Sequence, residues 1–380
     1  MSENKMKVMT VVGTRPEIIK LSAVIRELDK YTDHVLVHTG QNYDYELNEI
    51  FFKDLGLRKP DYFLDAVGTT PVKTVAKVIE KMDELIEKVQ PEAFLVLGDT
   101  NSCMGTYAAK RRKIPIFHME AGNRCFDMRV PEEVNRRIID HMSDINLVYS
   151  DITRANLLRE GLPTDRVIKS GSPTYEVLLR NMAKINASKI LSDLKLMKGR
   201  YFVLSAHREE NIDIPDNFTK LIHIINNVSD KYKLPIIFSC HPRTRKRIES
   251  EKVTLPKNVK IMKPLGLNDY VKLQMNAFCV LTDSGTISEE SSMLNFPAIN
   301  LRETHERAEA MDEASVIMTG LNPERVLQAL EIVKDQSRGD KREFRMPEDY
   351  SYTNVSKKVV RIILSYTDYV KQKVWLDYSN

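Results

Sequence analysis

Three carboxylates follow or end apolar runs where a strand would meet a helix. Asp99 comes directly after the run "AFLVLG", and Glu120 ends the run "IPIFHM". Glu132 follows Pro131, which opens a helical pattern. Carboxylates that converge near one strand end can act as acid and base, because burial and neighbouring charges move their pKa values apart.

Two of these carboxylates also have a plain structural explanation to be weighed. Asp99 could cap the helix that follows it, and Glu132 could favour a helix N-terminus electrostatically. Neither explanation accounts for Glu120, which ends a run that should be buried. Glu120 is therefore the residue that most strongly suggests chemistry.

A turn at Gly13–Arg15 offers a possible phosphate site. Backbone N–H groups and the helix dipole at such a turn suit an anion, and Arg15 adds a permanent charge. The turn is neither a P-loop nor the glycine fingerprint of dinucleotide-binding folds. A plain capped turn remains the alternative.

The second half of the chain carries basic residues at its strand ends. His207 and Arg208 end one apolar run, and His241 with Arg243 ends the next. A lone histidine in such a place is usually structural. Two histidines, each followed closely by arginine, favour anion binding.

The stretch "LTDSGTISEE" (281–290) predicts a tight turn from strand to helix. Gly285 permits close approach, so the N–H groups of this turn could bind a diphosphate. Glu290, one turn further, could accept hydrogen bonds from a ribose diol. Arg307 should lie at the neighbouring strand end. Without a dinucleotide fingerprint, this combination favours a sugar nucleotide.

The elements that must position these residues alternate along the whole chain. The apolar runs are continuous, as expected for parallel strands covered on both faces. Strands are expected at 7–13, 34–40, 93–99, 114–120, 145–150, 201–207, 234–242, 259–265, 279–285 and 297–303. Helices are expected at 15–30, 71–89 and 357–376, and the lysine-rich stretch 167–200 is expected to be helical without a strand.

Two successive series of strand and helix units predict two doubly wound α/β domains. We expect the first domain at 1–172 and the second at 173–356, with a hinge near Gly171–Pro173. The closing helix, 357–380, is expected to pack back on the first domain. Such sheets bind ligands beyond the carboxyl ends of their strands.

Composition narrows the class of protein. The chain of 380 residues is 42% hydrophobic and 29% charged, with a formal net charge of +4. This small imbalance predicts neither nucleic-acid nor membrane-surface binding. The four cysteines lack metal-ligand spacing and are expected to be reduced thiols. With no apolar run of signal-peptide or transmembrane length, we expect a cytoplasmic protein.

The ordered motifs "GTRPEIIK", "GDT", "EAGNR…PEEVNR", "HREEN", "LTDSGTISEE" and "RETHERAEA" resemble those of the non-hydrolysing UDP-N-acetylglucosamine 2-epimerase family over nearly the whole chain. The resemblance implies a glycosyltransferase-B fold, with two Rossmann-like domains facing across a cleft. It also implies a homodimer that uses no metal and no bound nicotinamide. The implied reaction eliminates UDP from C1, forms a 2-acetamidoglycal, and re-adds UDP after protonation of C2 on the opposite face.

The resemblance also assigns roles to residues. The catalytic group would be Asp99, Glu120, Glu132 and His207, with acid and base not assigned among the carboxylates. Diphosphate contacts would come from Arg15, His207, Ser284, Gly285 and Thr286, and ribose contacts from Glu290. The other expected substrate-binding residues are Lys20, Arg136, Arg208, His241 and Arg307.

Several segments resemble the branch that converts UDP-N-acetyl-L-talosamine to UDP-N-acetyl-L-fucosamine for surface polysaccharides such as capsule or O-antigen. They are "GNRCFDMRVPEE", "QNYDYELNE", "SAHREENID" and "QMNAF". Phe126 or Met128 could contact the methyl group of a 6-deoxy sugar. Gln41-Asn42 replaces the Gln-His pair of members activated by substrate, so such activation is not expected.

Four alternatives stay open. They are a UDP-N-acetylglucosamine to UDP-N-acetylmannosamine epimerase, a hydrolysing epimerase, a retaining glycosyltransferase of the same fold, and a catalytically silent sensor of nucleotide sugars. A transferase would not need three carboxylates in the first domain, and a sensor would not need the catalytic histidine with them.

Overall fold

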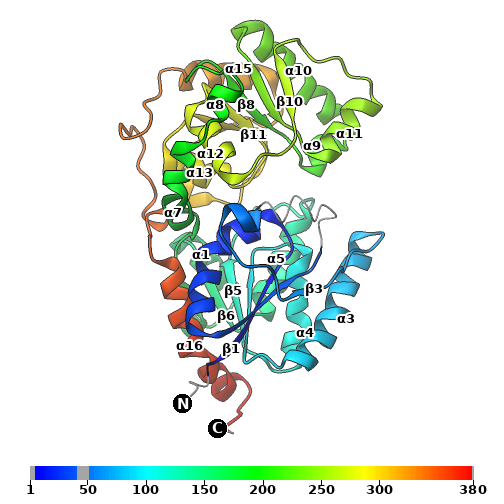
Figure 1. The fold of residues 1–380 in the computed structure, drawn as a ribbon, viewed down its shortest axis with the longest axis vertical. Helices are drawn as coiled ribbons and strands as arrows, with labels where there is room; N and C mark the ends of the chain where they lie inside the picture. The colour runs from blue at the N-terminus through cyan, green and yellow to red at the C-terminus, as the bar shows by residue number, and fades with distance from the viewer. Residues whose placement is uncertain (1–4, 41–50, 379–380) are drawn as a thin grey trace. The chain divides into compact units, whose positions relative to one another are not determined.

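The computed structural model describes residues 5–40 and 51–378, and the chain divides into two compact units (Figure 1). The first unit comprises residues 1–180 together with 349–380, and the second comprises residues 181–348. Each unit is an α/β structure built on one parallel sheet. Among the described residues, no helix is both long and apolar enough to cross a membrane.

The sheet of the first unit has the described strand order β3-β2-β1-β4-β5-β6-β7, with every pair parallel. Its strands are β1 (Lys7–Val12), β2 (Asp33–His38), β3 (Tyr62–Phe63), β4 (Ala93–Leu97), β5 (Ile116–Ala121), β6 (Ile145–Val148) and β7 (Val167–Lys169). The central strand β4 is buried along its whole length, which explains its continuous apolar sequence.

Helices join these strands in the order that a doubly wound sheet requires. They are α1 (Arg15–Tyr31), α3 (Pro71–Val89), η1 (Asn101–Gly105), α4 (Thr106–Arg111), α5 (Pro131–Met142), α6 (Asp151–Arg159), η2 (Thr164–Arg166) and α7 (Thr174–Ala187), followed after the second unit by η3 (Glu348–Tyr350) and α16 (Val355–Val374). Proline occupies the first turn of α1, α3 and α5, where the missing N–H costs no hydrogen bond.

The last helix belongs to the first unit. Helix α16 packs along α1, and the Glu176 carboxylate accepts hydrogen bonds from the backbone N–H and hydroxyl of Ser356 at 2.9 and 2.6 Å. The Ser172 N–H also donates to the carbonyl of Asp349 at 3.0 Å. These bonds hold the C-terminal segment against the chain just before and within α7.

The second unit contains a sheet with the described order β10-β9-β8-β11-β12-β13, again parallel. Its strands are β8 (Phe202–Ser205), β9 (Ile236–Ser239), β10 (Val259–Met262), β11 (Cys279–Thr282), β12 (Ala298–Asn300) and β13 (Ile317–Met318). Its helices are α8 (Ile190–Asp193), α9 (Glu209–Ile212), α10 (Pro215–Tyr232), α11 (Pro242–Ser250), α12 (Leu267–Asn276), α13 (Ile287–Leu294), α14 (Ala308–Asp312) and α15 (Pro323–Val333).

Each sheet is the centre of a hydrophobic core. In the first unit, side chains such as Met9 and Phe94 pack against Met82 of α3 and Ile139 of α5. In the second, Phe202, Leu281 and Ile299 pack against helices such as α10 and α15. Burial of these apolar faces fixes which strand ends lie side by side.

The structure corrects two predictions about the elements. The stretch 167–200, expected to lack a strand, contains β7. The short strands β3 and β13 were not predicted either. The turn at Gly171–Pro173 does not form the boundary between the units, because α7 begins in the first unit and the division follows Arg180. Gly171 instead has a φ of +82° and packs against the ring of Tyr352.

Candidate active site

Glu120 lies at an irregularity in β5, in the first unit. The pairing of β5 with β6 shifts register between Met119 and Ala121, and Glu120 has a φ of +67°. A residue other than glycine in this region is strained, and a bulge re-aims its side chain. The Glu120 carboxylate accepts from the Lys20 ammonium at 2.7 Å and from the Tyr149 hydroxyl at 3.1 Å. Both partners are buried, so the strand end is built around this carboxylate.

Asp99 follows β4, the neighbour of β5, and is held by Arg136 of α5. The Asp99 carboxylate accepts from Nε and Nη2 of Arg136 at 2.9 and 2.7 Å. The side chain of Asn135 donates to the Asp99 carbonyl at 2.9 Å. Helix α5 is thus fastened to the turn that carries Asp99. Arg136 was predicted to bind substrate, and here its guanidinium orients a predicted catalytic carboxylate.

The first turn of α5 carries two glutamates with different environments. Glu132 is partly exposed, whereas Glu133 is completely buried. Glu133 accepts from Arg136, Arg137 and the N–H of Cys125. Burial would raise the pKa of Glu133, but the Cys125 N–H and the Arg136 charge hold it below its ordinary value. Glu133 is therefore a structural anion, whereas Glu132 stays partly exposed.

A buried charged network supports the loops around Glu120. His118, two residues earlier, binds the Asp140 carboxylate at 3.0 Å and the Gly98 carbonyl at 2.8 Å. Burial would lower the pKa of His118, but Asp140 raises it above the ordinary value. Asp140 also accepts from Arg124 at 2.7 Å and from the Gly122 N–H at 3.2 Å. One network thereby fixes the backbone before Asp99 and after Glu120.

The turn at Gly13–Arg15 does not offer its first N–H groups to a phosphate. The N–H groups of Gly13 and Thr14 both donate at 2.7 Å to the Glu17 carboxylate, which forms a capping box with Thr14. Arg15 is half-buried, with its guanidinium 5.7 Å from the ring centre of Phe51. The backbone part of that prediction is wrong because a side chain of the same helix already satisfies the donors.

In the second unit, a buried aspartate organises the predicted phosphate site. Asp283 follows β11 and accepts from the N–H groups of His207 and Arg208, both at 2.9 Å, and from the Asn211 amide at 3.2 Å. The His207 ring lies 3.2 Å from Asp283 through Nδ1. Burial would raise the pKa of Asp283, but the His207 charge and these donors lower it to about 2.

The two histidines of the predicted site lie near each other. The ring centres of His207 and His241 are 6.1 Å apart. His241 caps α11, and its Nδ1 accepts from the Arg243 N–H at 3.3 Å. The His207 side chain is 39% exposed, so it can contact a ligand while Asp283 holds its other edge.

The turn Ser284–Thr286 connects to the predicted ribose-binding glutamate through hydroxyl groups. The hydroxyls of Ser284 and Thr286 are 3.0 Å apart, and Thr286 donates to Glu290 at 2.9 Å. The buried Gln274 amide donates to the other oxygen of Glu290 at 2.6 Å. This chain of contacts fixes the Glu290 carboxylate relative to the turn.

Basic side chains gather around Gly285. A Cβ at Gly285 would lie 3.6 Å from Arg302, 3.8 Å from Arg208 and 3.1 Å from Glu306, so this position has little room for a side chain. Arg302 makes a two-point ion pair with Glu306 at 2.8 and 2.9 Å. Arg307, predicted to bind substrate, donates to the buried Glu289 at 2.6 Å.

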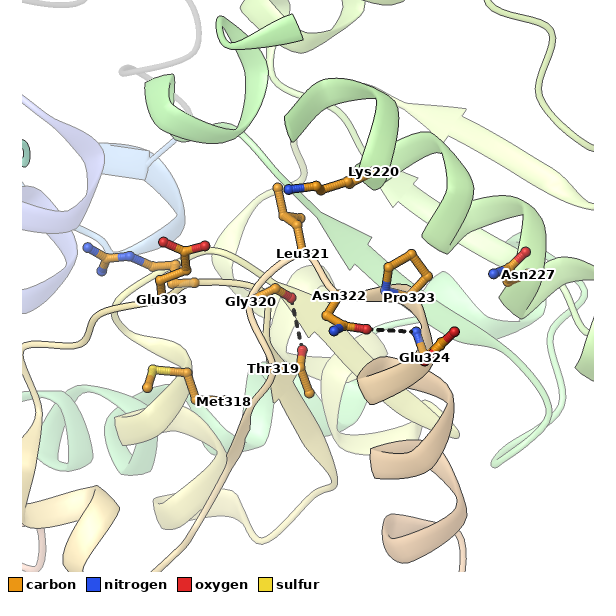
Figure 2. A pocket seen from close by; sticks show the side chains of 11 residues that line it. Lys220, Asn227, Glu303, Met318, Thr319, Gly320, Leu321, Asn322, Pro323 and Glu324 are labelled. Carbon is orange, nitrogen blue, oxygen red and sulfur yellow. Dashed lines mark hydrogen bonds between the residues drawn. The ribbon is translucent and has the colours of Figure 1, made fainter. Parts of the chain in front are cut away.

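A cavity of about 860 Å³ opens in the second unit between α10, β13 and the start of α15 (Figure 2). Its wall combines Lys220 and Arg302 with Glu303 and Glu324, so it favours neither sign of charge. The Asn322 side chain already caps α15 through the Glu324 N–H at 3.0 Å. The described residues of this wall include none of the predicted site residues.

The structure thus groups the predicted residues by unit. In the first unit, the strand ends and helix starts carry Arg15, Lys20, Asp99, Glu120, Glu132 and Arg136. In the second unit, they carry His207, Arg208, His241, Ser284, Gly285, Thr286, Glu290 and Arg307. Gln41-Asn42 falls outside the described residues. No group of three His, Cys, Asp or Glu within residues 5–40 and 51–378 could hold a metal ion.

Three residues of these clusters were missed from the sequence: Glu17, Tyr149 and Gln274. Glu17 carries a local signal, because threonine followed three residues later by glutamate is a capping box. Asp283 was noticed only as part of a turn. Tyr149 and Gln274 carry no local signal, because their partners Glu120 and Glu290 are distant in the sequence.

Comparison with known proteins identifies relatives that span the chain. The sequence model of the family described as "UDP-N-acetylglucosamine 2-epimerase" matches residues 26–364. A Pseudomonas aeruginosa protein named UDP-2,3-diacetamido-2,3-dideoxy-D-glucuronate 2-epimerase is 33% identical, covering 83% of this chain and 88% of its own length.

Solved structures agree with this match. The structure of UDP-N-acetylglucosamine 2-epimerase from Rickettsia bellii is 51% identical with a TM-score of 0.92, covering 98% of this chain and 100% of the other. That of the Methanocaldococcus jannaschii enzyme in complex with UDP-GlcNAc and UDP is 34% identical with a TM-score of 0.89, covering 95% and 100%. The α/β fold with two parallel sheets is therefore shared with these proteins.

Proposed function

Because this chain belongs to the UDP-N-acetylglucosamine 2-epimerase family, we propose that it inverts C2 of a UDP-N-acetylhexosamine without hydrolysing it. In the first half of the reaction, the C1–O bond breaks and its electron pair leaves with UDP. The C2 proton passes to a protein carboxylate and a C1=C2 double bond forms. UDP then bonds to C1 again while a proton reaches C2 from the opposite face, so the overall reaction is an isomerisation.

The observation that carries this proposal is the construction of the first-unit cluster. Asp99 follows β4 and Glu120 lies near the end of the adjacent strand β5, and a buried cation holds each one, Arg136 and Lys20 respectively. Glu132 comes from the helix that is bonded to the Asp99 turn. Proton transfer at a carbon of low acidity needs acids and bases in fixed positions, and these contacts fix them. Asp99, Glu120 and Glu132 are the proposed proton carriers.

The second-unit cluster is the proposed UDP site. His207, oriented by Asp283, and the turn Ser284–Thr286 would stabilise the charge that develops on the departing diphosphate. Glu290 would accept hydrogen bonds from the ribose hydroxyls. The complex of the Methanocaldococcus jannaschii relative with UDP-GlcNAc and UDP supports this class of ligand. Arg208 and His241 would contribute further positive charge there, and Arg15 is the further diphosphate contact that the family resemblance implies.

Two sugars are candidates for the substrate. The names of the relatives favour UDP-N-acetylglucosamine and its C2 epimer. The segment 122–133 favours the L-talosamine to L-fucosamine conversion, because Phe126 and Met128 expose 73% and 62% of their surface and could contact a 6-deoxy carbon. The 33% identical relative named for a third sugar supports treating the sugar as variable within the family.

Incubation with each UDP-sugar in deuterated water tests the reaction. Epimerisation incorporates deuterium at C2 of an intact nucleotide sugar, as read by NMR and mass spectrometry. A transferase or a sensor incorporates none, and a hydrolase releases UDP with the free sugar. Parallel incubations with UDP-N-acetylglucosamine, UDP-N-acetyl-L-talosamine and UDP-N-acetyl-L-fucosamine identify the substrate by the initial rate of exchange.

Glu120→Gln tests the carboxylate cluster separately from UDP binding. We expect loss of exchange by at least about 100-fold, because proton transfer by a positioned side chain contributes that much. Calorimetry should show unchanged UDP affinity. Glu84→Gln, an exposed change on α3, is the matched control. Loss of UDP affinity in Glu120→Gln would contradict the role assigned to Glu120.

A homodimer is also part of this proposal. Val134 and Ile138 lie one turn apart on α5 and are 41% and 39% exposed, as a subunit contact requires in the isolated chain. Light scattering of the purified protein measures its mass in solution and so tests the oligomeric state directly. Val134→Glu should then produce monomers, whereas a monomeric wild-type protein rules the homodimer out.

A further inference from the structure

One buried carboxylate joins two turns of the first unit that are far apart in the sequence. Glu17 is 1% exposed. Its Oε2 accepts from the N–H groups of Gly13 and Thr14 at 2.7 Å and from the Thr14 hydroxyl at 3.2 Å. Its Oε1 accepts from the Thr100 hydroxyl at 2.5 Å. The first oxygen thus binds the turn after β1, and the second binds the turn after β4.

The packing around this contact leaves little freedom. A Cβ at Gly13 would lie 1.9 Å from the Ser102 hydroxyl and 2.3 Å from that of Thr39, and those hydroxyls are themselves 2.8 Å apart. The turns after β1, β2 and β4 therefore meet at one point. Glu17 is the charged group at that point, and it directly contacts the residue that follows Asp99.

We propose that Glu17 is a positioning residue that holds the turn carrying Arg15 in register with the turn carrying Asp99. This inference rests on the function proposed above, in which Arg15 contacts the departing diphosphate and Asp99 carries a proton. Displacement of a reacting group by about 1 Å can cost about 100-fold in rate, so the separation of these turns affects turnover.

The ionised form of Glu17 is the form that makes all of these contacts. The Thr100 hydroxyl donates to Oε1 at 2.5 Å, and its oxygen accepts from the Ser102 N–H at 3.2 Å. A proton on Oε1 would make that oxygen a donor, so Thr100 would have to accept this hydrogen bond instead of donating it. Oε2 already receives three donors, which leaves Oε1 as the site of protonation.

Titration of Glu17 falls in the range where enzymes are assayed. Burial raises the pKa of Glu17 to about 7, against the hydrogen bonds from Thr100, Gly13 and Thr14. The other titratable groups at this point are Asp99 and the Cys103 thiol, whose Sγ lies 3.9 Å from Oε1. Burial, and then the charges of Glu17 and Asp99, raise the pKa of that thiol. No cation contacts Glu17 among the described residues. We therefore expect turnover to rise with pH as Glu17 ionises.

Two variants test the link from opposite sides. Thr100→Val removes the crossing donor, and we expect kcat for C2 exchange to fall about tenfold or more, by the loss of orientation, with unchanged UDP affinity. Thr100→Ser keeps the hydroxyl, so its kcat should stay within about threefold of wild type.

Glu17→Gln cannot ionise, so its pH–rate profile should lack the rise near neutral pH that wild type shows.

Carbon-13 NMR titration of the Glu17 carboxyl measures its pKa, and so tests the hydrogen bond from Thr100 without substrate. We expect a higher pKa in Thr100→Val than in wild type, because one hydrogen bond to the ionised form is lost. Equal Glu17 titration curves, or wild-type kcat and pH profile in both Thr100→Val and Glu17→Gln, would overturn the inference. Absence of exchange by wild type on every UDP-N-acetylhexosamine would instead reject the proposed function, and the titration would still decide the link.

Discussion

Glu17 in the first unit and Asp283 in the second perform the same structural task in different electrostatic surroundings. Glu17 joins the turns after the neighbouring strands β1 and β4, and Asp283 joins those after β8 and β11. Both side chains are buried. Yet the pKa of Glu17 is raised to about 7, whereas that of Asp283 is lowered to about 2.

The difference comes from the partners. The His207 side chain and the N–H groups of His207 and Arg208 lower the pKa of Asp283 against its burial, whereas the hydrogen bonds that Glu17 receives come from neutral hydroxyl and N–H groups alone. Hydrogen bonds from neutral donors lower the cost of a buried charge but do not cancel it. The second-unit turn is therefore held at any physiological pH, whereas the first-unit turn depends on the protonation of Glu17.

Asp283→Asn should have the largest effect. The substitution leaves an amide group facing backbone N–H groups that need an acceptor, and it removes the anion opposite His207. Breaking a buried pair in this way costs about 4 kcal/mol of unfolding free energy. Exchange at C2 should fall by about 100-fold at least, because His207 loses its orienting partner.

Urea unfolding and the exchange assay measure these two losses. Asp230→Asn is the control, because Asp230 pairs with Lys233 on the exposed surface of the same unit. An exposed pair contributes less than about 1 kcal/mol. If Asp283→Asn loses as little unfolding free energy as Asp230→Asn, the partners of Asp283 do not compensate its buried charge, and it does not differ from Glu17 in this way.

The pH dependence of stability should separate the two carboxylates next. The raised pKa of Glu17 means that its protonated form stabilises the folded state fully below the unfolded value near 4.5, and that this stability is lost as pH rises to about 7. The shift corresponds to about 3 kcal/mol. The lowered pKa of Asp283 gives stability that is present above about 3.8 and is lost as pH falls through about 2, worth about 2 kcal/mol.

Unfolding of wild type and Glu17→Gln at about pH 5 and about pH 8 isolates the Glu17 contribution, because other groups titrate equally in both proteins. Wild type should lose about 2.5 kcal/mol relative to the variant between these conditions, because part of the effect is already lost at pH 5. Parallel curves for the two proteins would mean that Glu17 ionises normally.

The sequence could predict features that have local causes, but not those that depend on contacts between distant residues. Continuous apolar runs located the buried strands, such as β4, because burial on both faces leaves a direct trace in residue type. The missed strands β3, β7 and β13 have two or three residues and form sheet edges. One side of an edge strand lacks a partner strand, so its sequence need not be apolar throughout.

The candidate site shows the same limit. Asp99, Glu120 and His207 could be identified because they end strands of recognisable pattern. The roles of their supports could not, because Tyr149 meets Glu120 across 29 residues and Asp283 meets His207 across 76. Which donor or cation reaches a carboxylate depends on the packing of strands that the sequence pattern does not align. Burial raises the pKa of Glu17 despite such contacts, whereas such contacts lower the pKa of Asp283 despite its burial.

Gln274→Met tests how a neutral donor orients the Glu290 carboxylate. Glu290 is oriented by a neutral amide, whereas Glu120 is oriented by the Lys20 ammonium. Loss of the amide donor should weaken UDP binding about tenfold, the value of roughly one buried hydrogen bond to a charged group. Calorimetry with UDP and 2′-deoxy-UDP measures it, and the deoxy analogue should lose less in the variant than in wild type.

Gln328→Met is the control for that change, because Gln328 is exposed and contacts Arg325 on α15. The variant should bind UDP as wild type does. An equal response of Gln274→Met to both nucleotides would show that Glu290 does not bind the ribose diol.

Tyr149→Phe should have the smallest effect, because Glu120 keeps its stronger partner. The substitution preserves the buried ring and removes one hydroxyl donor at 3.1 Å, while the Lys20 ammonium remains at 2.7 Å. We expect a loss of about threefold to fivefold in kcat, corresponding to the net value of one neutral donor of about 1 kcal/mol, with UDP affinity unchanged. Tyr369→Phe removes a matched phenol that donates to Asp165 in the same unit, and should leave kcat unaltered. A loss in Tyr149→Phe as large as that of Glu120→Gln would mean that the hydroxyl itself acts on the substrate, and the cation would then not be the main support of Glu120.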